Sequence, residues 1–206
     1  MSKDAPYTVT VYVAAPGTPL AGGGTSAAGH MYLSVERGEW SRSYGFAPIK
    51  HGATSGPGAI TDRDSRDYQN PYYARTLEIT KEQFDRIVEY GKDPAKHGFS
   101  MEYAGLSNSC IDFTWGALNH AGLHRQTKSG QDLGFEGAIK PLDNKREIES
   151  IPDPIPGSKL NTEINNDLPK RSLLQRLISE NDSYEGMIQN EQAQSQQREV
   201  SARQMG

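Results

Sequence analysis

The stretch SNSCIDFTWGALNHAG, residues 107–122, sets the chain's single cysteine at the start of a predicted helix. Its first three residues are N-cap types, and the apolar residues that follow recur at helical spacing: Cys110, Phe113, Ala117, Leu118 and Ala121. Gly122 is a suitable C-terminal stop. The unpaired N–H groups and positive dipole at a helix N-terminus stabilise a thiolate, the nucleophilic form of cysteine. A free cysteine is more often a small buried apolar residue, so a catalytic Cys110 also needs a neighbouring base.

A second stretch, GHMYLSV at residues 29–35, predicts a strand that begins at His30. Residues 36–39 form a turn into a second predicted strand at 40–46, which makes a hairpin. The alternation of the first strand gives it one apolar face, made by Met31, Leu33 and Val35, and one polar face, made by His30, Tyr32 and Ser34. His30 can therefore point into a cleft and take the proton of a thiol. The alternative is a surface histidine at a strand start.

The other four histidines are weaker candidates for the base. His51 lies in a Gly- and Pro-rich segment, and His97 lies near a predicted helix end. His120 and His124 flank the far end of the cysteine helix, about three turns from the thiol at about 1.5 Å per residue, which is too distant. No HExxH or similar spacing is present, so we expect no metal site and no cofactor.

Further elements follow from local patterns. The sequence predicts a strand over 7–15, a strand over 72–79 and a helix from Thr80 to Tyr90 that ends at Gly91, with Gln83 placed to complete a capping box. Residues 47–70 are dense in Gly, Pro, Ser and Asp, and this composition is typical of a long surface loop bordering a site.

Composition divides the chain into three parts. Only 34% of its 206 residues are apolar and the mean hydropathy is -0.72, so part of the chain is expected to lie outside a core. We expect a catalytic domain over 1–140, a Pro-rich arm and short helix that pack on this domain over 141–182, and a flexible polar tail over 183–206.

Charge and apolar patterning exclude several classes of partner. The net charge is -4 and no cluster of Lys and Arg is interleaved with aromatic residues, so nucleic acid is not an expected partner. No apolar run approaches the roughly 20 residues that cross a bilayer, and stable membrane insertion is not expected. The N-terminus carries no Sec signal pattern. One cysteine permits neither an internal disulfide nor a Cys-rich zinc site.

The two motifs, in this order, resemble permuted NlpC-type papain-like enzymes, which look related to lecithin-retinol acyltransferase-like and PPPDE-type cysteine peptidases. In that group the histidine strand precedes the cysteine helix, as His30 precedes Cys110 here. The resemblance implies an α+β fold in which an antiparallel sheet packs against a helix carrying the nucleophilic cysteine. It also implies that Cys110 attacks an amide carbonyl while His30 handles the proton.

A third polar residue is expected to orient His30. Acyltransferase-like members carry a second histidine on the next strand, but residues 41–44 here read Ser-Arg-Ser-Tyr. Ser43 is our choice, because it can share a face with His30, and Asp112 and Asn108 are alternatives. For the substrate side of the cleft we expect Tyr44, Asn108 and Asp112, together with Phe46 and the 47–70 segment.

The stretch from about residue 5 to about residue 160 also resembles cell-wall-targeting toxins of bacterial secretion systems, particularly type VI amidase effectors. That resemblance implies a peptidoglycan peptide substrate, a cognate immunity protein and a secretion apparatus as partners. It further implies synthesis in the bacterial cytoplasm without a Sec signal and action in the periplasm of a target cell. The alternatives are an acyl-lipid or ester hydrolase or acyltransferase of the same fold, and a non-catalytic binding module.

Overall fold

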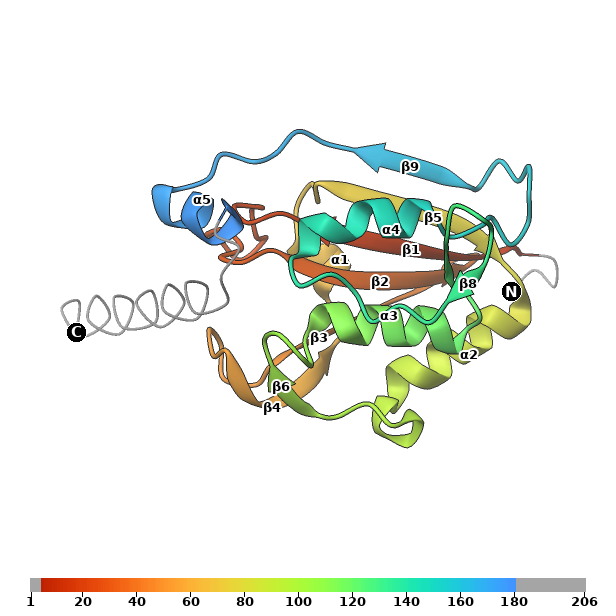
Figure 1. The fold of residues 1–206 in the computed structure, drawn as a ribbon, viewed down its shortest axis with the longest axis horizontal. Helices are drawn as coiled ribbons and strands as arrows, with labels where there is room; N and C mark the ends of the chain where they lie inside the picture. Colours follow the sequence, from red (N-terminus) through yellow and green to blue (C-terminus); the bar gives the residue numbers. More distant parts are fainter. Residues whose placement is uncertain (1–4, 181–206) are drawn as a thin grey trace.

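One antiparallel sheet organises the computed structural model, which describes residues 5–180 of the chain (Figure 1). Its strand order is β6-β4-β3-β2-β1-β5-β9. The strands are β1 (Tyr7–Ala14), β2 (His30–Arg37), β3 (Trp40–Pro48), β4 (Ser55–Thr61), β5 (Tyr73–Ile79), β6 (Glu102–Ala104) and β9 (Thr162–Asn165). The predicted β2–β3 hairpin is confirmed, with Arg37 paired to Trp40 beside the turn. The tail predicted over 183–206 lies outside the described residues.

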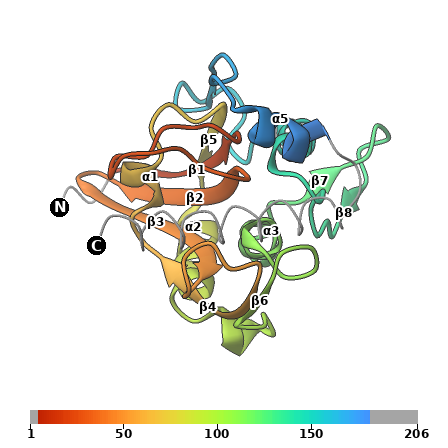
Figure 2. The ribbon, with the colours of Figure 1, turned by 90° about the vertical axis from the view of Figure 1, so that its left-hand side faces the viewer.

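Helices cover both faces of this sheet. They are α1 (Asp64–Asp67), α2 (Lys81–Lys92), α3 (Cys110–His120), α4 (Lys145–Glu149) and α5 (Leu173–Glu180), with 3-10 turns η1 (Pro94–His97) and η2 (Pro141–Asn144). A small second sheet pairs β7 (Arg125–Gln126) with β8 (Asp132–Leu133). Figure 2 shows α3 on one side of the sheet and α1 on the other. The expected α+β class with an antiparallel sheet is confirmed.

The core lies between the sheet and α3, which packs on β2, β3 and α2. The inward residues of β2, namely Met31, Leu33 and Val35, are fully buried, as are Phe113 and Leu118 of α3. The opposite face of β2 is covered as well, since Tyr32 and Ser34 are each 1% exposed. This second layer comes from α1 and from the residues around it, and it matters for His30.

The segment 47–70, predicted to be a loop, contains β4 and α1. Strand β4 pairs with β3 on one side and β6 on the other despite its Gly and Pro content. Gly58 has a packing role there, because a Cβ at that position would overlap the ring of Phe46. Long-range pairing therefore overrides the local turn composition.

Two other boundaries differ from expectation. Helix α2 continues through Gly91 to Lys92, and Gly91 has a packing role, since the ring of Tyr44 lies where a side chain would be. The Pro-rich arm after residue 140 is less extended than predicted, since η2 and α4 are helical, and it also contains β9, an edge strand on β5. Helix α5 lies where the short helix was predicted. Asn144 joins this segment to α3 by accepting a hydrogen bond from the indole of Trp115 at 2.9 Å. None of the helices within residues 5–180 is both long enough and apolar enough to cross a membrane.

Candidate active site

His30 is held at the first position of β2 by the backbone before it. Gly29 has φ +83°, and a Cβ there would come within 2.6 Å of the carbonyl oxygen of Ala14. Glycine is therefore required at this entry to the strand. His30 is 6% exposed, and its imidazole stacks on Tyr68 at 4.9 Å and on Tyr32 at 5.6 Å between ring centroids. The surface-histidine alternative does not describe this residue.

Asp64 is the polar partner of the His30 ring. The distance between His30 Nε2 and Asp64 Oδ2 is 3.0 Å, and the hydroxyl of Thr61 donates to the same oxygen at 2.5 Å. Asp64 is 5% exposed and is the first residue of α1. A carboxylate on one ring nitrogen fixes the orientation and protonation pattern of the imidazole, which leaves Nδ1 for a reacting group.

The sequence analysis missed Asp64. It lies within TDRDSRD at 61–67, where three aspartates stand close together without a feature that separates them. The structure separates them by burial, because Asp62 and Asp67 are exposed or half-buried. The short helix α1 packs on β2 and β3, and this packing brings Asp64 to His30.

Gly45 on β3 makes room for this carboxylate. A Cβ on Gly45 would overlap Asp64 Oδ2 and would come within 2.7 Å of Thr61 Oγ1. Gly45 lies on β3, the strand next to β2, and it has no side chain, so the Asp64 carboxylate can lie directly over the backbone of β3 beside the imidazole. Gly45 is thus a packing requirement of the His30–Asp64 pair.

Gly45→Ala is expected to destabilise the fold by about 1–3 kcal/mol, because the new methyl group displaces a buried, hydrogen-bonded carboxylate. In a chain of this size the melting temperature falls by about 2–4 °C for each kcal/mol, which thermal unfolding measures directly. Gly134→Ala is the matched control, since a Cβ at this exposed glycine meets nothing within 4 Å. Equal melting temperatures for the two variants would contradict the packing argument.

The electrostatics of the pair favour a charged imidazolium beside a carboxylate. Burial by itself lowers the pKa of His30, but Tyr68, Asp64 and Cys110 oppose it and hold that pKa well above the ordinary value. Burial by itself raises the pKa of Asp64, whereas His30 and Thr61 lower it below the ordinary value. Burial raises the pKa of Tyr68, so its phenol is neutral at pH 7. At neutral pH Asp64 is therefore the negatively charged partner of the His30 ring.

Cys110 opens α3, as predicted. Ser109 is the N-cap: its hydroxyl accepts from the backbone N–H of Ile111 at 3.2 Å, and the Asp112 carboxylate accepts from the backbone N–H of Ser109 at 2.7 Å. This capping box fixes the first turn of the helix. Cys110 is 6% exposed, and its proximity raises the pKa of both His30 and Tyr68. The helix terminus and the β2 start are thus neighbours in the fold.

The structure does not bring Ser43 to His30. Ser43 pairs with Ser34, four residues along β2, which at about 3.3 Å per residue is about 13 Å from His30. Its hydroxyl instead accepts from the backbone N–H of Ser65 at 3.3 Å and so helps to hold α1 in place. The partner of the imidazole is Asp64.

The three expected substrate residues have other contacts. Tyr44 is 1% exposed and packs in the core against Gly91. The side-chain amide of Asn108 donates to the carbonyl oxygens of Ser100 and Glu102, at 2.7 and 2.6 Å. Asp112 completes the N-cap of α3. These contacts support the fold around Cys110, and none of the three residues lines the cavity beside His30.

A cavity of about 200 Å³ lies beside His30. It is lined by Leu20, Thr25, Ser26, Ala27, Ala28, Gly29, His30, Phe46, Ala47, Pro48, His51, Gly52, Ala53, Tyr68 and Tyr103. Small residues dominate this wall, and none of these lining residues is Asp, Glu, Lys or Arg. His30 lines the cavity, and Cys110 does not. Phe46 and part of the 47–70 segment were expected at the site and do line this cavity.

The residues around His30 include no cluster suited to a metal ion. Among residues 5–180, the group of three His, Cys or carboxylate side chains close enough to share an ion is Glu89, His97 and His120, at the other end of α3. Comparison of the chain with protein-family models, with curated proteins and with solved structures gives no match. The geometry around His30, Asp64 and Cys110 is therefore the basis for assigning a function.

Proposed function

We propose that this chain is a cysteine amidase with the permuted papain-like, NlpC-type fold. Cys110 is the nucleophile, His30 is the acid and base, and Asp64 orients His30 in place of Ser43. The observation that carries the proposal is the buried His30–Asp64 pair, 3.0 Å between Nε2 and Oδ2, within electrostatic reach of a cysteine in the first turn of a helix. Buried titratable groups whose pKa is shifted by a specific charged partner are concentrated at functional sites.

The proposed reaction proceeds in two halves. The Cys110 thiolate attacks the amide carbonyl carbon, a C–S bond forms, and the C–N bond breaks as His30 gives its proton to the leaving amine. His30 then takes a proton from water, which attacks the thioester and releases the carboxylic acid and the thiolate. The backbone N–H of Cys110, unpaired in the first helical turn, is suited to stabilise the oxyanion of each half.

The cavity favours a small, uncharged acyl segment. Its volume of about 200 Å³ and its wall of Ala, Gly, Pro and aromatic residues suit short side chains such as that of alanine. Peptidoglycan stem peptides are rich in alanine, and an amide in such a peptide is our proposed substrate. The proposal includes the biology implied by the resemblance: an antibacterial effector, made in the bacterial cytoplasm, delivered by a secretion apparatus to the periplasm of a target cell, and opposed by an immunity protein.

Digestion of purified peptidoglycan tests this function. The full chain, Cys110→Ala, His30→Ala and His124→Ala are each incubated with sacculi, and released fragments are identified by mass spectrometry. We expect new amine and carboxyl termini at one type of amide bond from the wild type and from His124→Ala, whose imidazole instead contacts Asn119 at 3.1 Å. We expect none from the other two variants. A folded wild type that releases nothing from sacculi but hydrolyses acyl esters would overturn the cell-wall substrate and retain the thiol chemistry.

A further inference from the structure

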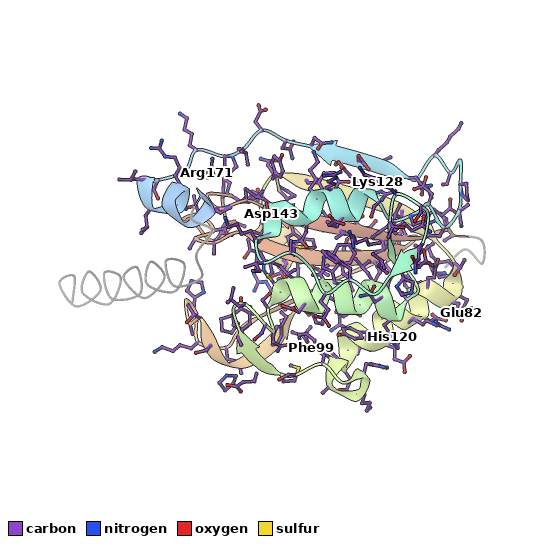
Figure 3. All side chains as sticks on the ribbon, in the orientation of Figure 1. Glu82, Phe99, His120, Lys128, Asp143 and Arg171 are labelled. Carbon is purple, nitrogen blue, oxygen red and sulfur yellow. The ribbon has the colours of Figure 1, made fainter. Side chains whose placement is uncertain are left out.

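A second group of polar side chains lies where α2, η1 and α3 meet, away from the His30 site. Glu89 comes from the last turn of α2, His97 from the end of η1 and His120 from the end of α3. Figure 3 shows His120 at the end of α3 that lies beside α2. Each of the three residues has one donor atom within 4.8 Å of those of the other two.

The donor atoms of both histidines are unpaired. His97 Nε2 and His120 Nε2 are buried, and neither has a hydrogen-bond partner among the described residues. The Glu89 carboxylate oxygens lie 3.9 Å from His97 Nε2 and 4.0 Å from His120 Nε2, which is too long for a hydrogen bond. The two imidazole centroids are 4.2 Å apart. Two adjacent buried nitrogens without partners are unfavourable unless a shared ligand satisfies them.

We propose that Glu89, His97 and His120 bind a divalent transition-metal ion, with Zn²⁺ as the best fit. Two His nitrogens and one carboxylate oxygen are a ligand set that zinc accepts, with bonds of about 2.0–2.2 Å. Two tetrahedral ligands at such bond lengths are about 3.4 Å apart, so the two carboxylate–imidazole separations of 3.9 and 4.0 Å need to shrink by about half an ångström. The Glu89 side chain is 66% exposed, which leaves a fourth position open to water.

The rings around the cluster hold the two histidines in place for this role. Tyr90 contacts both, with centroid distances of 5.6 Å to His97 and 5.6 Å to His120. Packing of this kind fixes the direction of each imidazole before an ion arrives, which lowers the entropic cost of binding. The linear spacing of these residues matches no metal motif, and the sequence analysis expected no metal for that reason.

The site is structural in character. His120 lies ten residues from Cys110 along α3, about 15 Å at about 1.5 Å per residue, so an ion there does not touch the reacting atoms. It would instead join α2 and η1 to the helix that carries Cys110. The proposal therefore stands or falls independently of the proposed amidase activity.

Metal titration of the full, tag-free chain tests the site. The Cys110→Ala variant is used as the background, because the thiol and His30 are themselves possible zinc ligands. After removal of metal with a chelator, Zn²⁺ binding is measured by calorimetry and Co²⁺ binding by its visible absorption. We expect one equivalent of Zn²⁺ with a dissociation constant of about 10 µM or tighter, weaker than sites with four protein ligands. Co²⁺ should give the intense visible bands of tetrahedral coordination.

Variants of the ligands locate the ion. On this background His120→Ala should weaken Zn²⁺ binding by at least about 100-fold and Glu89→Gln by at least about tenfold. His124→Ala, four residues beyond His120, is the matched control and should bind as the background does. Glu89 is too exposed for its amide variant to unfold the chain. Zinc at about 100 times its dissociation constant should also raise the melting temperature by about 5–10 °C, except in the ligand variants.

Two results would overturn the proposal. One is the absence of Zn²⁺ binding by the folded background protein up to about 1 mM. The other is binding that keeps its affinity in both Glu89→Gln and His120→Ala, because the ion would then lie elsewhere. Loss of peptidoglycan cleavage has no bearing on either result, since the background already lacks the thiol.

Discussion

Replacing Cys110 by alanine is expected to lower amide hydrolysis by at least about 10³-fold, because removal of a nucleophile abolishes the covalent route. The fold should remain, since the side chain is small and its helix is capped by Ser109 and Asp112. The measurement is the initial rate of fragment release from peptidoglycan, with circular dichroism and thermal unfolding as checks on folding. A catalytic loss with an unchanged melting temperature separates a nucleophile from a packing residue.

Two further variants sharpen this test. Cys110→Ser keeps the size of the side chain but is a far weaker nucleophile, and it should be almost as inactive as alanine. His30→Ala should cause a similar loss, and combining it with Cys110→Ala should add little, because residues that act as one unit are not additive. A Cys110→Ala protein that retains its biological effect would instead favour a non-catalytic binding module.

The elements that carry Cys110 and His30 could be predicted from sequence because their signals are local. Four consecutive residues, Ser109 to Asp112, form the capping box of α3, and apolar residues follow them at helical spacing. Strand β2 is marked by strict alternation after Gly29. Helix termini and strand faces depend on neighbours within a few positions, so a single sequence contains the information.

Asp64 could not be predicted, because its role depends on contacts across the sheet. Strand β4 has the composition of a loop, and its pairing with β3 and β6 is decided by residues far away in sequence. Once β4 forms, α1 follows it and places Asp64 over Gly45. Asp62 has the same side chain two positions earlier, but it stays at the surface 3.8 Å from Arg42.

Ser43 shows what the alternation of side chains along a strand cannot predict. Parity along a strand correctly puts Ser43 and His30 on the same face of the hairpin, but parity does not give the distance between them. The register does, and it pairs Ser43 with Ser34. The cluster of Glu89, His97 and His120 proposed to bind a metal ion is a stronger case of the same limit. These residues come from three separate elements and meet only in the folded chain.

Asp64→Asn is expected to lower amide hydrolysis by about 10–10³-fold and to move the alkaline limb of the pH–rate profile to lower pH. An amide cannot supply the negative charge that holds the imidazolium, so the His30 orientation and charge are both weakened. Burial of the ring remains, and burial lowers the pKa of His30. With the Asp64 charge gone, His30 loses its proton at a lower pH than in the wild type.

The same linkage predicts how stability depends on pH. Folding raises the pKa of His30, so this residue stabilises the folded chain fully at a pH below its pKa in the unfolded chain. That stabilisation is lost as the pH rises through the pKa of His30 in the folded chain. Folding lowers the pKa of Asp64, so this residue stabilises the folded chain at a pH above its pKa in the unfolded chain. That stabilisation is lost as the pH falls through the pKa of Asp64 in the folded chain. The melting temperature of the wild type should therefore fall at both the acidic and the alkaline end of the pH range. In Asp64→Asn both of these decreases should be smaller.

Asp62→Asn is the control that isolates position from charge. It removes one carboxylate from the same β4–α1 connection, but from a surface pair whose side chains are 44% and 57% exposed. Such pairs contribute little, so its pH–rate profile and its stability should match those of the wild type. If Asp62→Asn and Asp64→Asn shifted the alkaline limb equally, the effect would be a general loss of negative charge. A shift confined to Asp64→Asn would identify its carboxylate as the group that keeps His30 protonated.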